Sequence, residues 1–328
     1  MYKLERNYGL IDLHLHLDGS LSVKTVRELA QMQNMEVPAD DAKLLEMLQV
    51  SKDCKDLNEY LEKFSFPCSL LQVKEAITLA VYNLLEELKE QGLLYAEIRF
   101  APQLHTLKGL DQKAVVEAAV EGLYKSDMKA NLILCCMRGD TNQKENLETL
   151  DVAEMFLGKG VCAVDLAGAE ALYFTDAFKD LFAVADAKGL PRTIHAGEAM
   201  GPESVWSALE IGTKRIGHGV RSLEDCTLVR KLAEEGITLE MCPTSNLNTN
   251  MFPSIEEYPL RKLMDAGVKV TLNTDNMTVS GVTIRSEMEQ VIETFRLTDE
   301  ECRQLLCNAA KASFADENVK AWLLELIG

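Results

Sequence analysis

The chain alternates eight times between a short apolar run and a longer segment with helical spacing, and this alternation restricts its fold more than any other feature. Each run has the length of a β-strand and is followed by a polar or glycine-containing turn. The runs are Leu10–His16, Leu93–Ala101, Asn131–Met137, Val161–Leu166, Arg192–His195, Arg215–His218, Ile237–Met241 and Val268–Asn273. Eight strand–helix units predict an α/β protein of the closed (β/α)8, or TIM-type, barrel class. An open doubly wound sheet is the alternative, which is less favoured because no G-x-G-x-x-G turn accompanies the repeats.

Extra helices are expected after the first run and at the C-terminus. The connection from Gly19 to Gln91 is too long for one crossover helix. Helical patterns in it cover Val23–Met32, Asp41–Leu48, Asn58–Phe64 and Gln72–Lys89. Later ones cover Asp176–Lys188, Ser204–Ile211, Leu223–Glu235, Pro259–Ala266, Gly281–Phe295 and Asp316–Leu326, and a capping-box motif begins a helix at Thr298. No linker or internal repeat divides the chain, so residues 1–328 are predicted to form one domain.

The stretch Phe64-Ser65-Phe66-Pro67-Cys68 in the first connection has two interpretations. Its apolar residues are interrupted by proline. It could cover the mouth of the barrel as a lid, or it could be a helix end packed on the barrel wall.

Composition limits the partners of the chain. The 34 basic and 52 acidic residues give a net charge of −18, which repels phosphate backbones and anionic lipid. We therefore expect neither nucleic acid nor a membrane surface as a partner. The nine cysteines are scattered and form no C-x-x-C pair, as is typical of free thiols in a reducing compartment. Because neither a signal-peptide pattern nor a membrane-length apolar run is present, we expect a cytoplasmic protein, whose oligomeric state the sequence does not indicate.

Histidines mark three of the predicted strands. In the first strand, His14 and His16 alternate with leucines, so a period of two residues places both imidazoles on one face. The chain has only five histidines, and two others, His195 and His218, end short apolar runs just before glycine-containing turns. A shared metal is one interpretation of the pair, and the polar face of an edge strand is the other. The fifth histidine, His105, is assigned no role.

Polar side chains also gather where the predicted strands end. Glu198 follows the fifth run, and Asp275 and Asn276 follow the eighth. Active sites of barrels lie at the carboxyl ends of the strands, and the eighth strand closes onto the first. Three imidazoles and one carboxylate suit zinc and leave room for an activated water.

Each of these residues also has a purely structural interpretation. Asp275 could cap a helix or form a turn. His218 could bond the neighbouring backbone, and Glu198 could be a solvated turn residue. Four coincidences at strand ends of one fold favour the functional interpretation.

The chain resembles the adenosine deaminase family of the amidohydrolase superfamily. The matching motifs, in chain order, are His14-Leu15-His16-Leu17-Asp18-Gly19, Glu97-Ile98-Arg99-Phe100-Ala101-Pro102, Asp165-Leu166-Ala167-Gly168, His195-Ala196-Gly197-Glu198, Gly217-His218-Gly219 and Asn273-Thr274-Asp275. The resemblance extends from the first strand to the eighth. It implies zinc-dependent hydrolysis of adenosine, and of 2′-deoxyadenosine, to the inosine product and ammonia, in purine salvage.

The resemblance also implies the role of each site residue. One zinc ion per chain is bound by His14, His16, His195 and Asp275. The substrate is contacted by His16, Asp18, the backbone of Gly168 and Asn276. Zinc makes hydroxide available for attack on C6, while His218 and Asp275 take up or orient the proton. Glu198 delivers a proton to N1 of the purine, and ammonia leaves.

One position departs from the family pattern. Many relatives carry a second Asp after the zinc aspartate, whereas this chain has Asn276, at the position associated with purine N7. The base preference therefore stays open among adenosine, adenine, 6-aminodeoxyfutalosine and methylthioadenosine. AMP is disfavoured, since no basic cluster for a phosphate is evident. Two functions from other classes are further alternatives. An amide or ester hydrolase with two metals needs a bridging ligand, and no candidate for one is evident at a strand end. A catalytically silent barrel is expected to have lost a metal ligand, and none is missing here.

Overall fold

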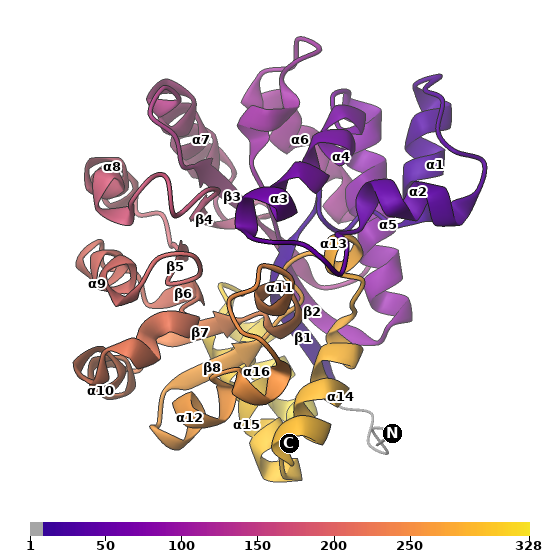
Figure 1. Cartoon of the computed structure of the whole chain (residues 1–328). Helices are drawn as coiled ribbons and strands as arrows, with labels where there is room; N and C mark the ends of the chain where they lie inside the picture. Colours follow the sequence, from indigo (N-terminus) through magenta and orange to yellow (C-terminus); the bar gives the residue numbers. More distant parts are fainter. Residues whose placement is uncertain (1–8) are drawn as a thin grey trace.

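Eight parallel strands run through the centre of the computed structural model, which describes residues 9–328. They are β1 (Leu10–His16), β2 (Leu93–Phe100), β3 (Ala130–Met137), β4 (Val161–Ala167), β5 (Ile194–Ala196), β6 (Arg215–His218), β7 (Thr238–Met241) and β8 (Lys269–Leu272). Hydrogen bonding joins β1 to β4 in one sheet and β5 to β8 in another, each in chain order. Parallel bridges Val164–Arg192 and Leu15–Asp275 connect the two sheets at both seams. The fold is thus the (β/α)8 barrel that the alternation predicted (Figure 1).

The predicted strands differ from the observed ones only at their ends. The bounds of β1 and β6 agree with the prediction. The fifth strand was predicted to begin at Arg192, but β5 begins at Ile194. Arg192 pairs with β4 through a single bridge, because the Thr193 N–H and the Pro191 carbonyl both bond to Val164, and regular pairing with β6 begins only at Ile194.

Six helical segments occupy the connection between β1 and β2. They are α1 (Val23–Met32), α2 (Asp41–Leu48), α3 (Leu57–Leu61), η1 (Glu62–Phe64), α4 (Ser65–Leu70) and α5 (Lys74–Glu90). The predicted helix over Asn58–Phe64 is instead split into α3 and a 3-10 turn. Pro67 does not interrupt α4, because it lies in the first turn, where a helix needs no N–H donor from it.

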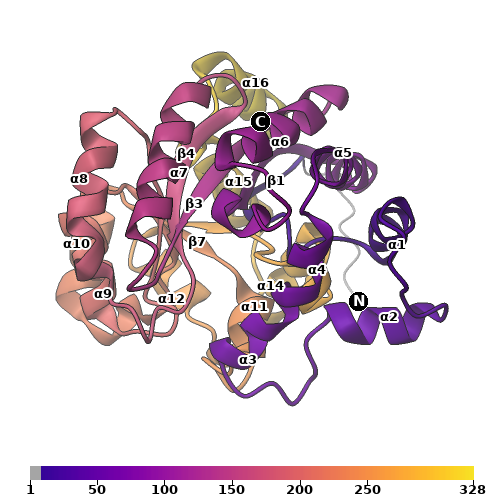
Figure 2. The ribbon, with the colours of Figure 1, turned by 90° about the horizontal axis from the view of Figure 1, so that it is seen from above.

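The other helices follow the remaining strands; most cover the barrel from outside, whereas α11 and α13 lie at its carboxyl end (Figure 1). They are α6 (Gln112–Lys125), α7 (Gln143–Phe156), α8 (Lys179–Ala187), α9 (Pro202–Glu210), α10 (Cys226–Glu235), α11 (Pro243–Asn248), α12 (Leu260–Asp265), α13 (Met277–Ser280), α14 (Ile284–Phe295), α15 (Asp299–Ala312) and α16 (Glu317–Ile327). Short 3-10 turns lie at η2 (Pro102–His105), η3 (Thr175–Phe178), η4 (Val220–Glu224) and η5 (Ile255–Glu257). Figure 2 shows the longer helices arranged around the strands. No helix of residues 9–328 combines the length and apolarity that a membrane crossing requires.

The predicted helix over Gly281–Phe295 begins later than expected. Gly281 has φ +67° and ends the short helix α13, and α14 starts at Ile284 after the cap residue Thr283. Glycine is favoured there because an L side chain rarely adopts that backbone conformation.

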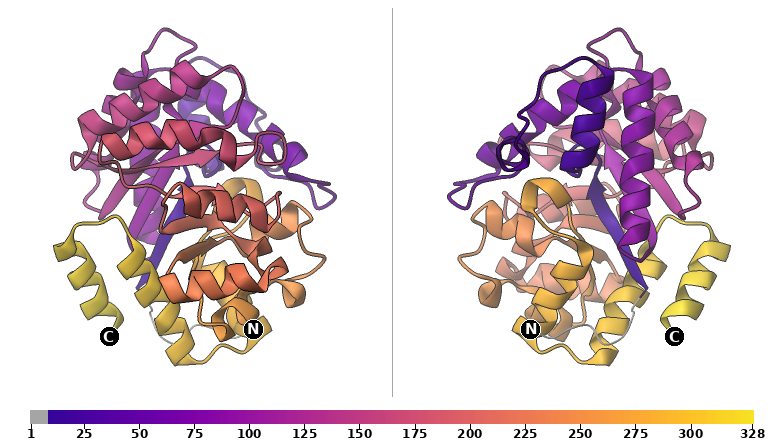
Figure 3. Two further views of the ribbon diagram at one scale, coloured as in Figure 1. Left: turned by 90° about the vertical axis from the view of Figure 1, so that its left-hand side faces the viewer. Right: turned by 90° about the vertical axis from the view of Figure 1, so that its right-hand side faces the viewer.

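One hydrophobic cluster connects the barrel to its helices. Its buried members extend along the chain from Leu10 to Ile327. The C-terminal helix α15 contacts both β8 and β1, and Figure 3 shows the yellow C-terminal helices beside the indigo first strand. A single domain over the whole chain stays a prediction.

Candidate active site

The predicted histidines and Asp275 meet at the carboxyl ends of the strands. His14 and His16 end β1, His195 lies in β5, and His218 ends β6. Asp275 follows β8, and its backbone closes the barrel: its N–H donates to the His14 carbonyl (2.8 Å), and its carbonyl accepts from the His16 N–H (2.7 Å). Closure of the barrel therefore places the carboxylate beside the histidine pair.

Three imidazole nitrogens converge near one carboxylate oxygen. Asp275 Oδ1 is 3.4 Å from both His14 Nε2 and His16 Nε2, and His16 Nε2 is 3.2 Å from His195 Nε2. His218 is also close, since ligand atoms of His14, His195, His218 and Asp275 lie within 4.8 Å of one another. His14 Nε2 is buried and has no hydrogen-bond partner among the described residues. A divalent cation with nitrogen and oxygen ligands fits this donor set.

Buried carboxylates orient two of the rings. Glu240 Oε2 is 2.8 Å from His14 Nδ1, and Asp165 Oδ2 is 2.9 Å from His195 Nδ1. Each contact engages the δ nitrogen and leaves Nε2 facing the cluster. Histidines that ligate metals typically have such a carboxylate on their other nitrogen.

Burial sets the protonation of the cluster. It lowers the pKa of His16 well below its usual value and also lowers that of His195, although the Asp275 and Asp165 carboxylates oppose the shifts. Burial alone would raise the pKa of Asp275, but His14 and His16 hold it well below its usual value. Neutral imidazoles and an ionised carboxylate are the forms that bind a metal.

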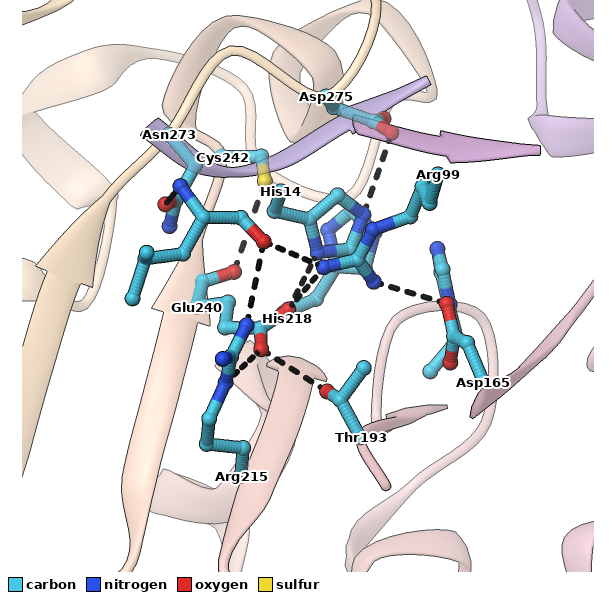
Figure 4. A network of polar contacts seen from close by, with 12 residues as sticks. His14, Arg99, Asp165, Thr193, Arg215, His218, Glu240, Cys242, Asn273 and Asp275 are labelled. Carbon is cyan, nitrogen blue, oxygen red and sulfur yellow. Dashed lines mark hydrogen bonds and ion pairs between the residues drawn. The ribbon is translucent and has the colours of Figure 1, made fainter. Parts of the chain in front are cut away.

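Two arginines inside the barrel support these carboxylates (Figure 4). Arg99 contacts Asp165 Oδ2 and Glu240 Oε2, both at 2.8 Å. Arg215 Nε is 2.6 Å from Glu240 Oε1. Although burial acts in the opposite direction, the Arg215 and Arg99 charges hold the pKa of Glu240 well below its usual value. The carboxylates that orient the histidines are thus kept ionised.

Backbone strain and close packing occur at the same site. His218 and Asp275 have φ of +61° and +60°, conformations that non-glycine residues rarely adopt. A Cβ atom at Gly217 would lie 2.9 Å from the His14 ring, so only glycine leaves room for it. The glycine before His218 therefore serves ring packing, which the motif alone did not indicate.

The cluster lies at the bottom of a cavity of about 260 Å³. Among the predicted site residues, those that line it are His16, Asp18, Gly168, His195, Glu198, His218, Asp275 and Asn276. His14 is fully buried beneath them. The structure thus brings all nine predicted site residues into one region. His105 does not line the cavity; it is buried against Phe100, and burial lowers its pKa to about 4.

Other lining residues were not foreseen. The apolar part of the wall comes mainly from the first connection and from the ends of β2 to β4, with Leu57, Tyr60, Leu61, Phe64, Leu104 and Met137. Phe64, which belongs to the stretch with the two interpretations of a lid or a packed helix end, lines the cavity. Arg138 also lines the cavity and donates to the His195 carbonyl at 2.6 Å. No local pattern marked these residues, because they meet only in the folded chain.

Glu198 and His218 form a pair suited to proton transfer. Glu198 Oε2 is 3.6 Å from His218 Nε2. Burial raises the pKa of Glu198, while the His218 charge opposes the shift. The pKa of His218 is raised by Glu198 and Asp275 against the effect of burial. A carboxyl group and an imidazole this close to each other can exchange protons with a ligand in the cavity.

Two predicted substrate contacts retain unused polar atoms. Asp18 Oδ1 and Asn276 Oδ1 are buried and have no hydrogen-bond partner among the described residues. Burial raises the pKa of Asp18 to about 6, and Cys68 Sγ donates to its other oxygen at 3.4 Å. Both residues line the cavity, so a ligand there can supply the partners.

Comparison with known proteins agrees with this geometry. Residues 10–328 match the family model described as adenosine deaminase. The chain is 49% identical to the adenosine deaminase of Haemophilus ducreyi, covering 97% of this chain and 96% of the relative. It is 39% identical to that of Clostridium perfringens strain SM101, covering 96% of each.

Solved structures share the fold. The adenine deaminase of Arthrobacter aurescens superposes with a TM-score of 0.89 at 28% identity, over 98% of both chains. An amidohydrolase of Burkholderia ambifaria, solved with bound Zn, gives a TM-score of 0.86 at 22% identity over 96% of this chain and 88% of that one. At 22% identity, the similarity to the Burkholderia protein concerns the fold alone.

Proposed function

The chain belongs to the adenosine deaminase family, and from this premise we propose that it hydrolyses adenosine, and 2′-deoxyadenosine, to the corresponding inosine and ammonia. The observation that carries the proposal is the meeting of three imidazole ε nitrogens with Asp275 at the bottom of a cavity that Glu198 also lines. A nitrogen-rich cation site beside a buried acid suits hydrolysis of an amidine-like C–N bond.

We assign one zinc ion per chain to this site. His14, His16, His195 and Asp275 would hold it, with the unpartnered Nε2 of buried His14 as the clearest indication of a missing ligand. Zinc, when bound, lowers the pKa of water so that hydroxide is available near neutral pH. His218 lies close enough to be an additional contact, but its Nε2 is 3.6 Å from Glu198 Oε2, a position that suits it to hold a proton.

The protein side chains divide the proton transfers between them. The water that attacks C6 loses a proton, which His218 and Asp275 can take up or orient. Glu198, whose pKa burial raises, gives a proton to N1 as C6 becomes tetrahedral. The proton taken from the water passes to the amino group, which leaves as ammonia, and the C6 hydroxyl gives up its proton to restore Glu198 as the carbonyl of inosine forms. Water and adenosine are consumed, and inosine and ammonia are formed.

We propose contacts to both the ribose and the purine base of the substrate. Asp18 faces the cavity with an unused oxygen for a ribose hydroxyl, and Asn276 can donate its amide N–H to purine N7. His16 and the backbone of Gly168, which has φ +107°, also line the cavity. Leu57 and Phe64 form an apolar wall that offers no partner for a phosphate. The guanidinium of Arg138, which also lines the cavity, already donates to the carbonyls of Tyr173 and His195 and to Thr175 Oγ1. We therefore favour nucleosides over AMP.

An ultraviolet assay with metal analysis on the same sample tests the proposal. We expect conversion of adenosine to inosine and one zinc per chain. Adenine, methylthioadenosine and 6-aminodeoxyfutalosine serve as competing substrates, because the solved adenine deaminase has a similar fold. If one of them had a much higher kcat/KM than adenosine, that compound would be the substrate in place of adenosine.

Ligand variants complete this test. His16→Ala and Asp275→Ala are expected to lose both metal and turnover, since removing one of four ligands opens the site to water. The control His105→Ala removes a histidine outside the cavity and should keep the metal. A ratio near two metals per wild-type chain would contradict the single-zinc assignment.

We also propose a cytoplasmic role in purine salvage. All nine cysteines lie in the described residues, and none forms a disulfide. Most of them are buried, as expected for structural thiols in a reducing compartment. The net charge of −18 supports a small nucleoside rather than nucleic acid or an anionic membrane as the partner.

A further inference from the structure

One buried carboxylate binds the whole loop that carries Glu198. Glu170, which is 1% exposed, lies just after β4. It accepts four consecutive backbone N–H groups: Gly197 at 2.7 Å on Oε1, and Glu198, Ala199 and Met200 at 3.0, 2.7 and 2.9 Å on Oε2. Ser204 Oγ donates a fifth hydrogen bond to Oε1. A run of N–H groups around one anion is a built anion-binding concavity, here filled by the protein itself.

The Glu198 side chain has no comparable restraint. Within the described residues its carboxyl forms no hydrogen bond, and its nearest charged neighbour is His218 Nε2 at 3.6 Å. The position of the acid is therefore decided by its backbone. The carbonyls of the same loop are also held, because Arg221 donates to those of Gly197 (3.1 Å) and Ala199 (3.0 Å).

The turn at Gly197 and the start of α9 also restrict the position of the loop that Glu170 binds. Gly197 has φ +69°, and a Cβ there would lie 2.5 Å from Val205 Cγ2 in α9. Glu170 also lies beside the start of α9, where the helix dipole favours a negative charge. The anchor, the turn and the helix thus form one unit around residues 197–200.

We propose that Glu170 is a positioning residue that holds the acid Glu198 against the purine ring by gathering the N–H groups of residues 197–200. The inference rests on the proposed deaminase function. It assigns Glu170 no contact with substrate or metal. Its effect on turnover passes through Glu198 alone.

A set of single variants measures the size of this effect. Glu170→Ala should lower kcat on the order of 10²-fold, because misplacing a reacting group by about 1 Å costs that much. The metal content should stay at one per chain. In Glu170→Gln the amide oxygen can still accept from the three N–H groups that bind Oε2, but the NH₂ group cannot accept from Gly197. Its kcat should lie between those of wild type and Glu170→Ala.

Asp225→Ala is the matched control. Asp225 is also a carboxylate with several donors, since it accepts from Thr227, Leu228 and Trp206, but it does not line the cavity. Asp225→Ala should lower the melting temperature about as much as Glu170→Ala does, because each variant loses a carboxylate that accepts several hydrogen bonds. Its kcat should stay within about threefold of wild type. Loss of metal in both Glu170 variants would overturn the proposal, since Glu170 would then act through His195.

A double-mutant cycle with Glu198→Gln separates positioning from general stability. If Glu170 acts through Glu198, Glu170→Ala or Glu170→Gln should change kcat by less than about threefold in the Glu198→Gln background. The same fold-loss in both backgrounds would show a purely structural role and overturn the proposal. Because Glu170→Gln keeps most of the hydrogen bonds, the cycle can be completed with it if Glu170→Ala does not fold.

Hydrogen exchange provides a readout that does not depend on the substrate. The amides of residues 197–200 should exchange faster in Glu170→Gln than in wild type, while those of β5 stay unchanged. If wild-type protein does not deaminate adenosine, the proposed function fails while this exchange result still tests the anchor. Unchanged exchange at residues 197–200 would contradict the anchor itself.

Discussion

At the scale of single residues, the surroundings of the histidines differ between the proposed metal ligands and the proposed proton carrier. His14 and His195 each have a carboxylate on the δ nitrogen, which presents Nε2 to the cluster. His218 instead has Asn246 at its δ nitrogen (3.1 Å) and Glu198 near its ε nitrogen. An amide partner permits either ring tautomer, since it offers both a donor and an acceptor. The three histidines of similar burial are therefore suited to different tasks.

The first prediction concerns Glu198. Glu198→Gln preserves the shape of the side chain but cannot transfer a proton, so kcat should fall about 10²–10⁴-fold. The metal-to-protein ratio should stay near one, because Glu198 is not among the assigned ligands. Steady-state kinetics with metal analysis checks both. Near-normal turnover with metal in place would make Glu198 a structural turn residue.

The second prediction concerns Asn276, which is buried and lines the cavity. Purine N7 accepts hydrogen bonds, and an amide donates to it without any change of protonation. Asn276→Ala should weaken kcat/KM for adenosine by about 1–3 kcal/mol, the usual cost of leaving a polar group unpaired. Metal content should not change.

The analogue 7-deazaadenosine gives the control for Asn276. It lacks the N7 acceptor but also differs in ring reactivity, so its rate relative to adenosine must be measured in both wild type and Asn276→Ala. The intrinsic difference then cancels between the two enzymes. An unchanged preference would show that Asn276 does not contact N7.

At the scale of elements, helix caps in the C-terminal layer support the strands that carry the site. Thr298 caps α15: its side chain accepts from the Glu301 N–H, and the Glu301 side chain accepts from the Thr298 N–H at 2.8 Å. The capping box predicted at this position is thereby confirmed. Because α15 packs on β1 and β8, the cap supports the seam at which Asp275 meets the histidines.

The third prediction tests this cap. Thr298→Ala should lower the free energy of unfolding by about 1 kcal/mol, the usual cost of losing a Thr cap. Turnover of the folded enzyme should not change. Urea unfolding measures the loss, with Glu300→Gln as control: Glu300 lies in the same turn but makes only an exposed ion pair, at 3.6 Å from Arg303. Equal losses in the two variants would show that the cap contributes nothing specific.

At the scale of the whole molecule, charges rather than apolar side chains connect strands across part of the barrel interior. Arg215 on β6 contacts Glu97 on β2 and Glu240 on β7, each at 2.6 Å. Arg99 on β2 continues the network to Asp165 on β4. All five groups are almost completely buried, so each charge depends on its partners.

The fourth prediction concerns this network. Arg215→Met should lower the free energy of unfolding by about 3–5 kcal/mol, because Glu97 and Glu240 lose a buried partner. The adjacent control Lys214→Met removes an exposed cation that is 3.3 Å from Glu235 and should cost less than about 1 kcal/mol. Urea unfolding compares the two. Equal effects would show that the interior charges are exchangeable with apolar groups.

The order of residues was enough to predict the barrel and the side chains that gather at its carboxyl end. Period-two alternation placed His14 and His16 on one face, and parallel topology placed His195, Glu198, His218 and Asp275 at one end. These inferences succeed because strand periodicity and strand direction are local properties that the order of residues already encodes.

How these groups are held could be seen only in the folded chain. Glu170 lies 28 residues before Glu198, and Glu240 lies 226 residues after His14, and no local pattern connects either pair. The same is true of the cavity wall from Leu57 to Phe64, which is separated from Asn276 by most of the chain. Contacts of this kind depend on which side chains the closed barrel brings within a few ångströms of one another. Packing and burial therefore set the pKa values and the orientation of residues whose chemical types the sequence had already identified.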